Sequence, residues 1–90
     1  MDENMRLKQA SNVTFQNVAG EAILIRLDTG TYFSLNKVGT QFWEMLDGSQ
    51  TIAEQARTLA EQYDVDSAMV RDDLLELAVA MQEENLVEVV

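Results

Sequence analysis

The sequence predicts an α+β fold in which a three-stranded antiparallel sheet is followed by three helices. Two β-prone segments flank a glycine turn near residue 30, and three later segments carry apolar residues at helical spacing behind good helix caps. The chain has 90 residues, 47% of them hydrophobic. This length and composition predict one folded domain over residues 1–90, with a flexible polar arm at residues 1–11.

The first two predicted strands lie on either side of a turn at residues 17–20. Residues 13–15 form a short β-prone patch, and residues 21–28 form the strongest strand of the chain. Side chains of a strand alternate between its two faces, so every second residue of this strand is expected on the buried face. The residues assigned to that face are Ile23, Ile25 and Leu27.

A hairpin turn at residues 28–30 predicts the third strand. Gly30 supplies the positive φ that such a turn requires, and residues 31–35 return antiparallel to the strand before. Phe33 and Leu35 are expected to point inward, while Tyr32 and Ser34 face away.

The first predicted helix begins after Asn36, whose side chain is a good N-cap. It runs to about Asp47, and Gly48 stands where a glycine would end it. One helical face gathers the apolar side chains expected in the core. These are Val38, Phe42, Met45 and Leu46.

Two further helices are marked by their caps. Thr51 and Glu54 have the spacing of a capping box and begin a helix that ends near Tyr63. Asp66 caps a third helix, which ends near Glu84. The predicted core residues are Ile52, Ala56, Leu59, Ala60 and Tyr63 in the second helix, and Val70, Leu74, Leu77, Ala78 and Met81 in the third.

The end of the chain completes this order of elements. Asn85 tolerates a left-handed conformation and can end the third helix, and residues 86–90 can form a final strand. Three helices behind a small sheet resemble a winged helix-turn-helix. Since many winged proteins bind DNA, a DNA-binding regulator is one alternative, although a fold does not fix a function.

The composition argues against catalysis and against a bound cofactor or metal. The chain contains no Cys and no His, so it has neither a thiolate nucleophile nor the most common general base and metal ligand. The acidic residues around Asp64 and Asp72 lack the spacing and the glycine of a calcium-binding loop. We therefore expect no enzyme, and a small metal-dependent enzyme has no ligand set to support it.

The net charge of −10 indicates which classes of partner the protein can bind. Proteins bind nucleic acids largely by neutralising phosphates with Lys and Arg, and this chain has only 6 such residues. The acidity serves solubility, attraction to a basic partner, or both. The chain shows no secretory signal and no apolar run long enough for a membrane span, so we expect a cytoplasmic protein without a nucleic-acid or membrane partner.

The third helix and the third strand together predict a groove for a peptide. Apolar residues lie on several sides of the helix, including Leu75, Val79 and Met69. The strand at residues 31–35 has no Pro or Lys to protect it as a sheet edge, so a peptide could pair with it as an extra strand. Alternatively, another element, the C-terminal tail or a second subunit covers these surfaces.

At this point the sequence resembles the PqqD-like family, whose members are recognition elements for ribosomally made, post-translationally modified peptides (RiPPs). The resemblance covers about residues 13–88, and Asn85 replaces the family's usual glycine. It is carried by Tyr32-Phe33-Ser34-Leu35-Asn36, Gly39, Trp43, Leu46, Asp47-Gly48 and Thr51, and by Val70, Asp73, Leu74, Leu77, Met81 and Leu86.

The resemblance implies a free-standing, non-catalytic chaperone that binds a precursor's leader peptide by strand addition. It presents the leader to a modifying enzyme or a leader peptidase, in lasso-peptide biosynthesis or, alternatively, in pyrroloquinoline quinone or other radical-enzyme chemistry. Asp73 and Glu76 could hold basic leader residues. The leader-binding residues implied in this way are Thr31, Tyr32, Phe33, Ser34, Leu35, Met69, Val70, Asp73, Leu74, Glu76 and Leu77.

Overall fold

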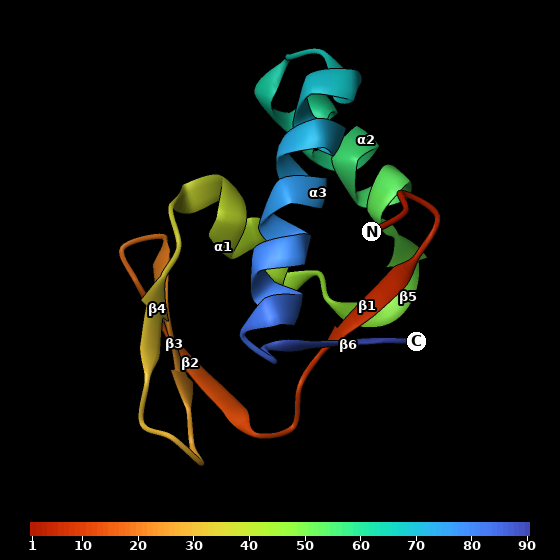
Figure 1. Cartoon of the computed structure of the whole chain (residues 1–90). Coiled ribbons are helices and arrows are strands. Elements are labelled where there is room, and N and C mark those ends of the chain that lie inside the picture. The colour runs from red at the N-terminus through yellow and green to blue at the C-terminus, as the bar shows by residue number, and fades with distance from the viewer.

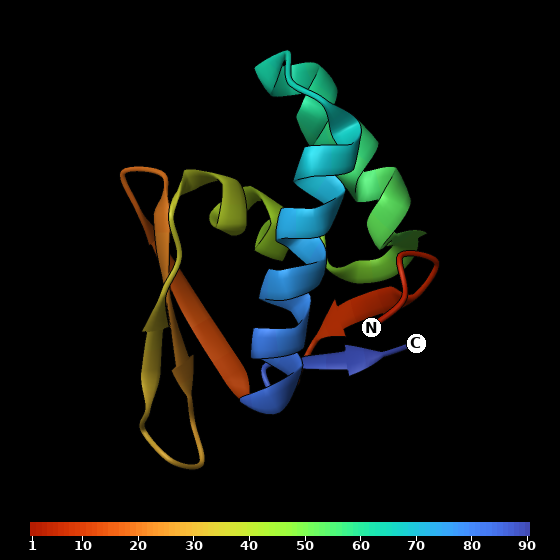
Figure 2. The same ribbon diagram turned by 45° about the horizontal axis from the view of Figure 1, so that its top comes forward.

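The computed structural model describes residues 1–90 and contains three helices and two three-stranded antiparallel sheets (Figure 1). The α+β class is confirmed, but a single sheet was predicted and two are present. The elements are β1 (Arg6–Gln9), β2 (Val13–Val18), β3 (Glu21–Arg26), β4 (Tyr32–Ser34), α1 (Lys37–Glu44), β5 (Asp47–Thr51), α2 (Ile52–Tyr63), α3 (Ser67–Glu83) and β6 (Val87–Val89). Helix α3 runs through the middle of the molecule, with one sheet on each side of it (Figure 1 and Figure 2).

The first sheet has the order β5-β1-β6, with β1 at its centre. This strand lies where the sequence predicted a flexible arm. The residues before β1 also supply hydrogen-bond acceptors for the start of α2. The N–H groups of Ile52 and Ala53 donate to the carbonyls of Met5 (3.1 Å) and Glu3 (2.9 Å), respectively. The first N–H groups of a helix have no partner within the helix, so the N-terminal segment serves as part of the cap of α2.

The second sheet has the order β2-β3-β4 and faces α1 and α3 with one side. Its inward residues on β3 are Ala22 and Leu24, both fully buried, so the predicted inward face of this strand is wrong. The small side chain of Ala22 lets α1 approach, and its N–H donates to the buried Thr40 hydroxyl (2.8 Å). A β-branched or larger residue at this point would keep α1 away. The three residues predicted inward, Ile23, Ile25 and Leu27, are exposed.

Strand β4 agrees with its prediction. Phe33 lies opposite Leu24 in the antiparallel register, and it packs against the core together with Leu35. Tyr32 and Ser34 face solvent, as expected. Gly30 has a φ of +73° in the turn before this strand, which is the conformation that glycine was predicted to supply.

Helix α1 begins as predicted and ends earlier. The side chain of Asn36 accepts a hydrogen bond from the Gly39 N–H (2.8 Å). The helix is capped at Met45, and Gly48 lies inside β5 with a φ of +84° rather than at the helix end. The predicted role of Gly48 as the helix terminator is therefore wrong, because the chain leaves the helix early enough to pair with β1.

The caps of the two longer helices are confirmed. The Thr51 hydroxyl accepts from the Glu54 N–H (3.1 Å), and the Glu54 carboxylate accepts from the Thr51 N–H (2.8 Å). Asp66 accepts from the Ala68 N–H (2.9 Å), and Asn85 has a φ of +57° after α3. The final strand β6 is present and pairs with β1.

The core lies where α1, α2, α3 and both sheets meet. Trp43 and Phe42 are its largest buried side chains, and the Trp43 ring meets Phe15 of β2 edge-to-face at 5.8 Å. Tyr63, predicted in the core, is instead 41% exposed because it lies in the last turn of α2. No helix of the chain is both long enough and apolar enough to span a lipid bilayer.

Candidate functional site

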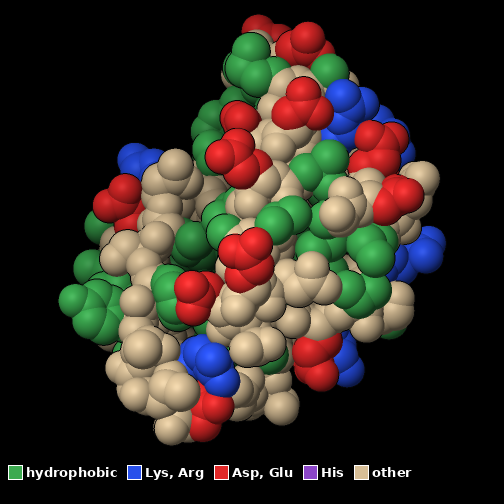
Figure 3. All heavy atoms as spheres, viewed as in Figure 1, with side chains coloured by type: hydrophobic (Ala, Val, Ile, Leu, Met, Phe, Trp, Pro, Cys, Tyr) green, Lys and Arg blue, Asp and Glu red, His purple; other side chains and the backbone are tan.

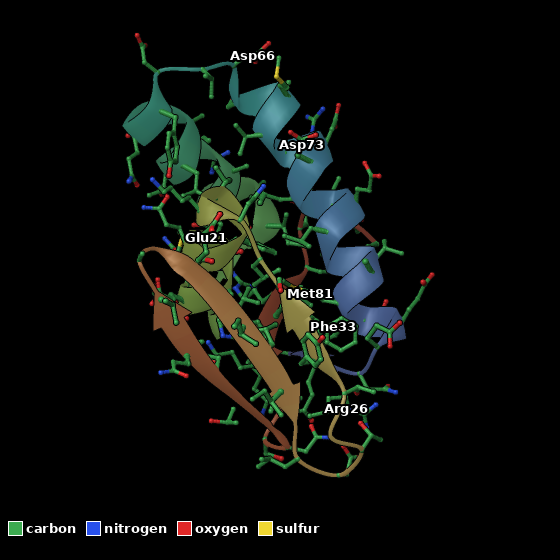
Figure 4. The ribbon with its side chains drawn as sticks, turned by 90° about the vertical axis from the view of Figure 1, so that its left-hand side faces the viewer. Glu21, Arg26, Phe33, Asp66, Asp73 and Met81 are labelled. Carbon is green, nitrogen blue, oxygen red and sulfur yellow. The ribbon has the colours of Figure 1, made fainter.

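Strand β4 leaves one edge of its sheet unpaired. It pairs only with β3, and neither a Pro nor a charged side chain lies within its three residues. Figure 4 shows β4 as the strand of this sheet that lies nearest to α3. The predicted alternative in which the C-terminal tail covers this edge is wrong, because β6 pairs with β1 in the other sheet.

The hydrogen bonds of β4 show which backbone groups face the open edge. The Leu35 N–H donates to the Ala22 carbonyl at 2.9 Å. At the other end of the strand, the Arg26 N–H donates to the Thr31 carbonyl at 2.9 Å. Backbone groups of an antiparallel strand alternate in direction, so every second residue between these two bonds points outward. The N–H and C=O groups at the open edge are those of Tyr32 and Ser34.

A groove with a volume of about 580 Å³ begins at the end of β4 and continues between α1 and the first half of α3. Nine of its 13 lining residues are hydrophobic. A groove of this size and character is suited to apolar side chains of a ligand. The lining residues are Ser34, Leu35, Asn36, Val38, Gly39, Leu59, Tyr63, Val65, Met69, Val70, Asp73, Leu74 and Leu77.

Helix α3 forms one wall of the groove with a single flank. Met69 is 61% exposed there, Val70 and Leu77 are half-buried, and Leu74 reaches down to the core. On the other flank, Leu75 packs against the core and Val79 faces solvent outside the groove. The apolar residues on several sides of α3 therefore divide between core, groove and solvent.

Helix α1 forms the opposite wall, and Gly39 sets its distance from α3. A Cβ atom at this position would lie 3.4 Å from Leu77 Cδ2 and 3.2 Å from the Asn36 side-chain oxygen. The latter is tighter than an ordinary van der Waals contact, so a larger residue would displace the cap of α1 or widen the groove. At the far end, the Tyr63 hydroxyl hydrogen bonds to the Gln41 side chain at 2.5 Å and links α2 to α1.

The groove has one charged lining residue, Asp73. Other acidic side chains lie along the exposed face of α3, which Figure 3 shows in red across the middle of the molecule.

Away from the groove, at the end of β3, Arg26 donates to the Glu84 carbonyl (3.3 Å) and joins the sheet to the end of α3. Partial burial works to raise the pKa of Asp28, but the hydrogen bond and charge of Arg26 hold that pKa below its ordinary value.

The structure brings most of the predicted site residues together. Ser34, Leu35, Met69, Val70, Asp73, Leu74 and Leu77 line the groove. Tyr32 and Phe33 belong to the strand β4 that leads into it, Thr31 directly precedes that strand, and Glu76 is exposed on α3 outside the groove. Their role in binding stays a prediction.

Sequence reasoning missed the part of the lining that comes from α1 and from the end of α2. Tyr63 was assigned to the core, and Val65 was not assigned at all. The sequence carries a weak signal only for Val65, an apolar residue between Asp64 and Asp66 that joins no helical stripe, whereas Tyr63 continues the stripe of the second helix. Only the tertiary fold brings this turn, α1 and the end of β4 to the same groove.

This arrangement offers backbone hydrogen bonding and apolar contact. No group of three or more His, Cys, Asp and Glu side chains lies close enough to hold a metal ion. An open strand edge beside an apolar groove is the geometry that accepts an extended peptide.

Comparisons with known proteins agree with this geometry. The family model described as "Coenzyme PQQ synthesis protein D (PqqD)" matches residues 21–87. None of the curated proteins matches the chain. Among solved structures, TbiB1 in complex with the TbiA(beta) leader peptide is 31% identical, with a TM-score of 0.81 and coverage of 90% of this chain and 94% of that chain.

Two further structures share the fold at lower identity. Lasso peptide synthetase B1, complexed with the leader peptide, is 17% identical with a TM-score of 0.81, covering 92% of this chain and 98% of that one. The PqqD truncation of Methylobacterium extorquens PqqCD, described as a stand-alone RiPP recognition element, is 19% identical with a TM-score of 0.77, covering 91% and 87%. Because the family model spans most of the chain and TbiB1 is similar over nearly all of it, this chain belongs to the PqqD family.

Proposed function

We propose that this protein is a non-catalytic RiPP recognition element, a chaperone for the leader of a ribosomally made precursor peptide. The open edge of β4 beside an apolar groove carries the proposal. TbiB1, the 31% identical neighbour, is described in complex with a leader peptide. Residues 1–90 act as one recognition domain, and α2 and α3 are its helix-turn-helix pair in a winged fold.

In this proposal the leader adds as a fourth strand beside β4. The outward N–H and C=O groups of Tyr32 and Ser34 supply the ladder hydrogen bonds, each worth about 0.5–1.5 kcal/mol net. The backbone of residues 31–35 holds the leader in register. Side chains of the leader that point inward enter the groove and contact Met69, Val70, Leu74 and Leu77, and a basic leader residue lies near Asp73 and Glu76.

The bound leader is presented to a modifying enzyme or a leader peptidase. We propose lasso-peptide biosynthesis as the setting, on the resemblance of residues 32–36 and of the Leu-Asp-Gly segment at residues 46–48 to that group. The alternative is pyrroloquinoline quinone or other radical-enzyme chemistry, which the family description favours. A DNA-binding regulator is disfavoured by the net charge of −10, and the lack of Cys and His supports a protein without catalysis of its own.

The test is a calorimetric titration with the leader of a precursor encoded beside this gene. We expect saturable binding of the leader, no binding of a scrambled leader of the same composition, and no binding of duplex DNA at physiological salt. Sequence-selective binding of DNA, or equal affinity for the scrambled peptide, would contradict the proposed function. Comparing leaders of the lasso and radical-enzyme classes decides between the two settings.

A further inference from the structure

The outer face of sheet β2-β3-β4, the face turned away from the core, carries apolar side chains that no other element covers. The exposed fractions of these side chains run from 38% to 71%. Figure 3 shows hydrophobic side chains along the left margin of the molecule, where this sheet lies in the same view of Figure 1. We call these residues the outer patch: Val18, Ile23, Ile25, Leu27 and Tyr32.

The outer patch is almost free of charge, unlike the rest of the surface. The other outward strand positions are occupied by Thr14, Gln16, Ser34 and Glu21, of which only Glu21 is charged, although 24% of the whole chain is charged. A hollow of about 390 Å³ lies at the α1 end of the sheet, and its lining includes Val18, Ile23, Ser34 and the charged Glu21. A contiguous apolar surface with few charges and a hollow is typical of a docking site for a protein.

The outer patch is continuous with the edge at which the leader is proposed to bind. Tyr32 belongs both to the patch and to β4. A strand added beside β4 extends the pleat of the sheet, so every second side chain of the leader would lie on the outer face next to Tyr32 and Ser34. The leader-bound protein would therefore display a larger surface, made partly of the protein and partly of the leader.

We infer that the outer patch, together with the outward side chains of the bound leader, is the docking surface for the enzyme that processes the precursor peptide. The inference rests on the proposed function and adds a partner surface to it. A second copy of this chain fits the patch less well. Two copies of net charge −10 repel each other, and a dimer formed through this face would hide the leader side chains from the enzyme.

The test uses a double variant, Ile25→Thr with Leu27→Gln, because neither residue lines the groove or belongs to β4. Ile25 lies opposite Tyr32 on the neighbouring strand, so its replacement leaves the outward backbone groups of β4 in place. Threonine keeps the β-branched shape that suits a strand, and Leu27 is exposed outside β3. The matched control is Val79→Gln on α3, since Val79 is 37% exposed and Ile25 is 38% exposed. The probe is the purified leader peptidase or modifying enzyme encoded beside this gene, titrated against the leader-bound protein.

We expect the double variant to keep the parent's affinity for the leader and to lose at least about tenfold in affinity for the enzyme. The Val79→Gln variant should keep both affinities. Normal leader binding with unchanged enzyme affinity would overturn the docking surface alone. A parent protein that binds no leader would contradict the proposed function itself. Sedimentation that shows a dimer of the parent, dissociated by the double variant, would assign the patch to self-association instead.

Discussion

The hydroxyl group of Thr40 joins the two elements that form the site. It accepts the Ala22 N–H of β3 at 2.8 Å and lies 3.4 Å from the Leu35 carbonyl at the end of β4. The side chain is buried in the first half of α1. A single buried hydroxyl therefore fixes α1, one wall of the groove, against the sheet that carries the open edge.

We predict that Thr40→Val destabilises the fold by about 1–3 kcal/mol, because the isosteric change leaves the Ala22 N–H buried without an acceptor. Thr40→Ser, which keeps the hydroxyl, is the control and should lose less. Urea unfolding followed by circular dichroism measures both. A Thr40→Val variant as stable as the parent, or more stable than Thr40→Ser, would show that the hydrogen bond of this hydroxyl contributes little to the stability.

Substitutions of Leu74 and Leu77 test separately the stability of the fold and the binding of the leader by the groove. Leu74 is almost fully buried, so we predict that Leu74→Ala costs about 2–5 kcal/mol of stability. Leu77 is half-buried on the groove wall, so Leu77→Ala should cost less stability and weaken leader binding more. Urea midpoints and calorimetric leader affinities, measured on both variants, check this. The reverse ranking would place Leu77 in the core, as the sequence predicted.

The capping box of α2 makes the stability of the protein depend on pH. The N–H of Thr51 donates to the Glu54 carboxylate at 2.8 Å, and this bond, with the one from the Thr51 side chain, lowers the pKa of Glu54 below its ordinary value of 4.5. A pKa lowered in the folded state means that the unfolded state binds more protons in this range. The contribution is therefore present above pH 4.5 and is lost as the pH falls through the folded pKa.

We predict that Glu54→Gln is less sensitive to acid than the parent protein. Between about pH 7 and about pH 3, the parent should lose more unfolding free energy than the variant, since only the parent has a carboxylate to protonate at this cap. Urea unfolding at a series of pH values measures the difference. Parallel curves for the two proteins would show that Glu54 does not contribute to the acid sensitivity.

At the scale of elements, the sequence predicted the features that depend on neighbouring residues. It did not predict the features that depend on residues far apart in the chain. The caps at Asn36, Thr51 and Asp66 depend on neighbours within three residues, and all three are confirmed. Strand β5 has the sequence Asp-Gly-Ser-Gln-Thr, which is typical of a turn, and it is a strand because it pairs with β1 about forty residues earlier. No local pattern contains that pairing.

The difference between local and long-range interactions also explains which residues of the site could be predicted from the sequence. The edge at residues 31–35 was predicted from a local feature, the absence of Pro and Lys, and the excess of apolar residues predicted a groove beside α3 without fixing the flank. The groove residues of α3 were implied only by the resemblance to the PqqD-like family. The inward face of β3 was not predicted correctly, because Ile23 and Ile25 are more apolar than Ala22, and only the approach of α1 makes a small residue necessary there. The contributions of Tyr63 and Val65 to the groove likewise depend on how α2 meets α1.

We predict that proline substitutions in β4 differ in kind between adjacent residues. The Ser34 N–H points to the open edge, so Ser34→Pro should leave the hairpin bonds intact and weaken leader binding at least about tenfold. The Phe33 N–H points to β3, so Phe33→Pro should remove a hairpin bond. The backbone group left without its partner should destabilise the fold by about 1–3 kcal/mol. Thermal melting and leader calorimetry measure the two effects. If Ser34→Pro binds the leader like the parent, the leader does not pair with β4.

At the scale of the whole molecule, charge is distributed unevenly. The net charge of −10 gives the surface a negative potential that attracts a basic peptide from a distance, while the outer patch is nearly uncharged. The groove begins at the end of β4 and contains one carboxylate, that of Asp73. A long-range field and a local contact are therefore two separate contributions to leader affinity, and they can be measured separately.

Two variants of equal charge separate these contributions. Asp73→Asn and Glu83→Gln each remove one negative charge from exposed positions of α3, but only Asp73 lines the groove. For a leader with a basic residue near the groove, we predict that Asp73→Asn weakens binding by about two- to fivefold, the effect of losing one exposed ion pair. Glu83→Gln should change the affinity less, because it weakens only the field. Salt should weaken binding of the parent and of the Glu83 variant more steeply than binding of the Asp73 variant. Equal effects of the two substitutions at every salt concentration would mean that the net charge alone attracts the leader and that Asp73 makes no specific contact.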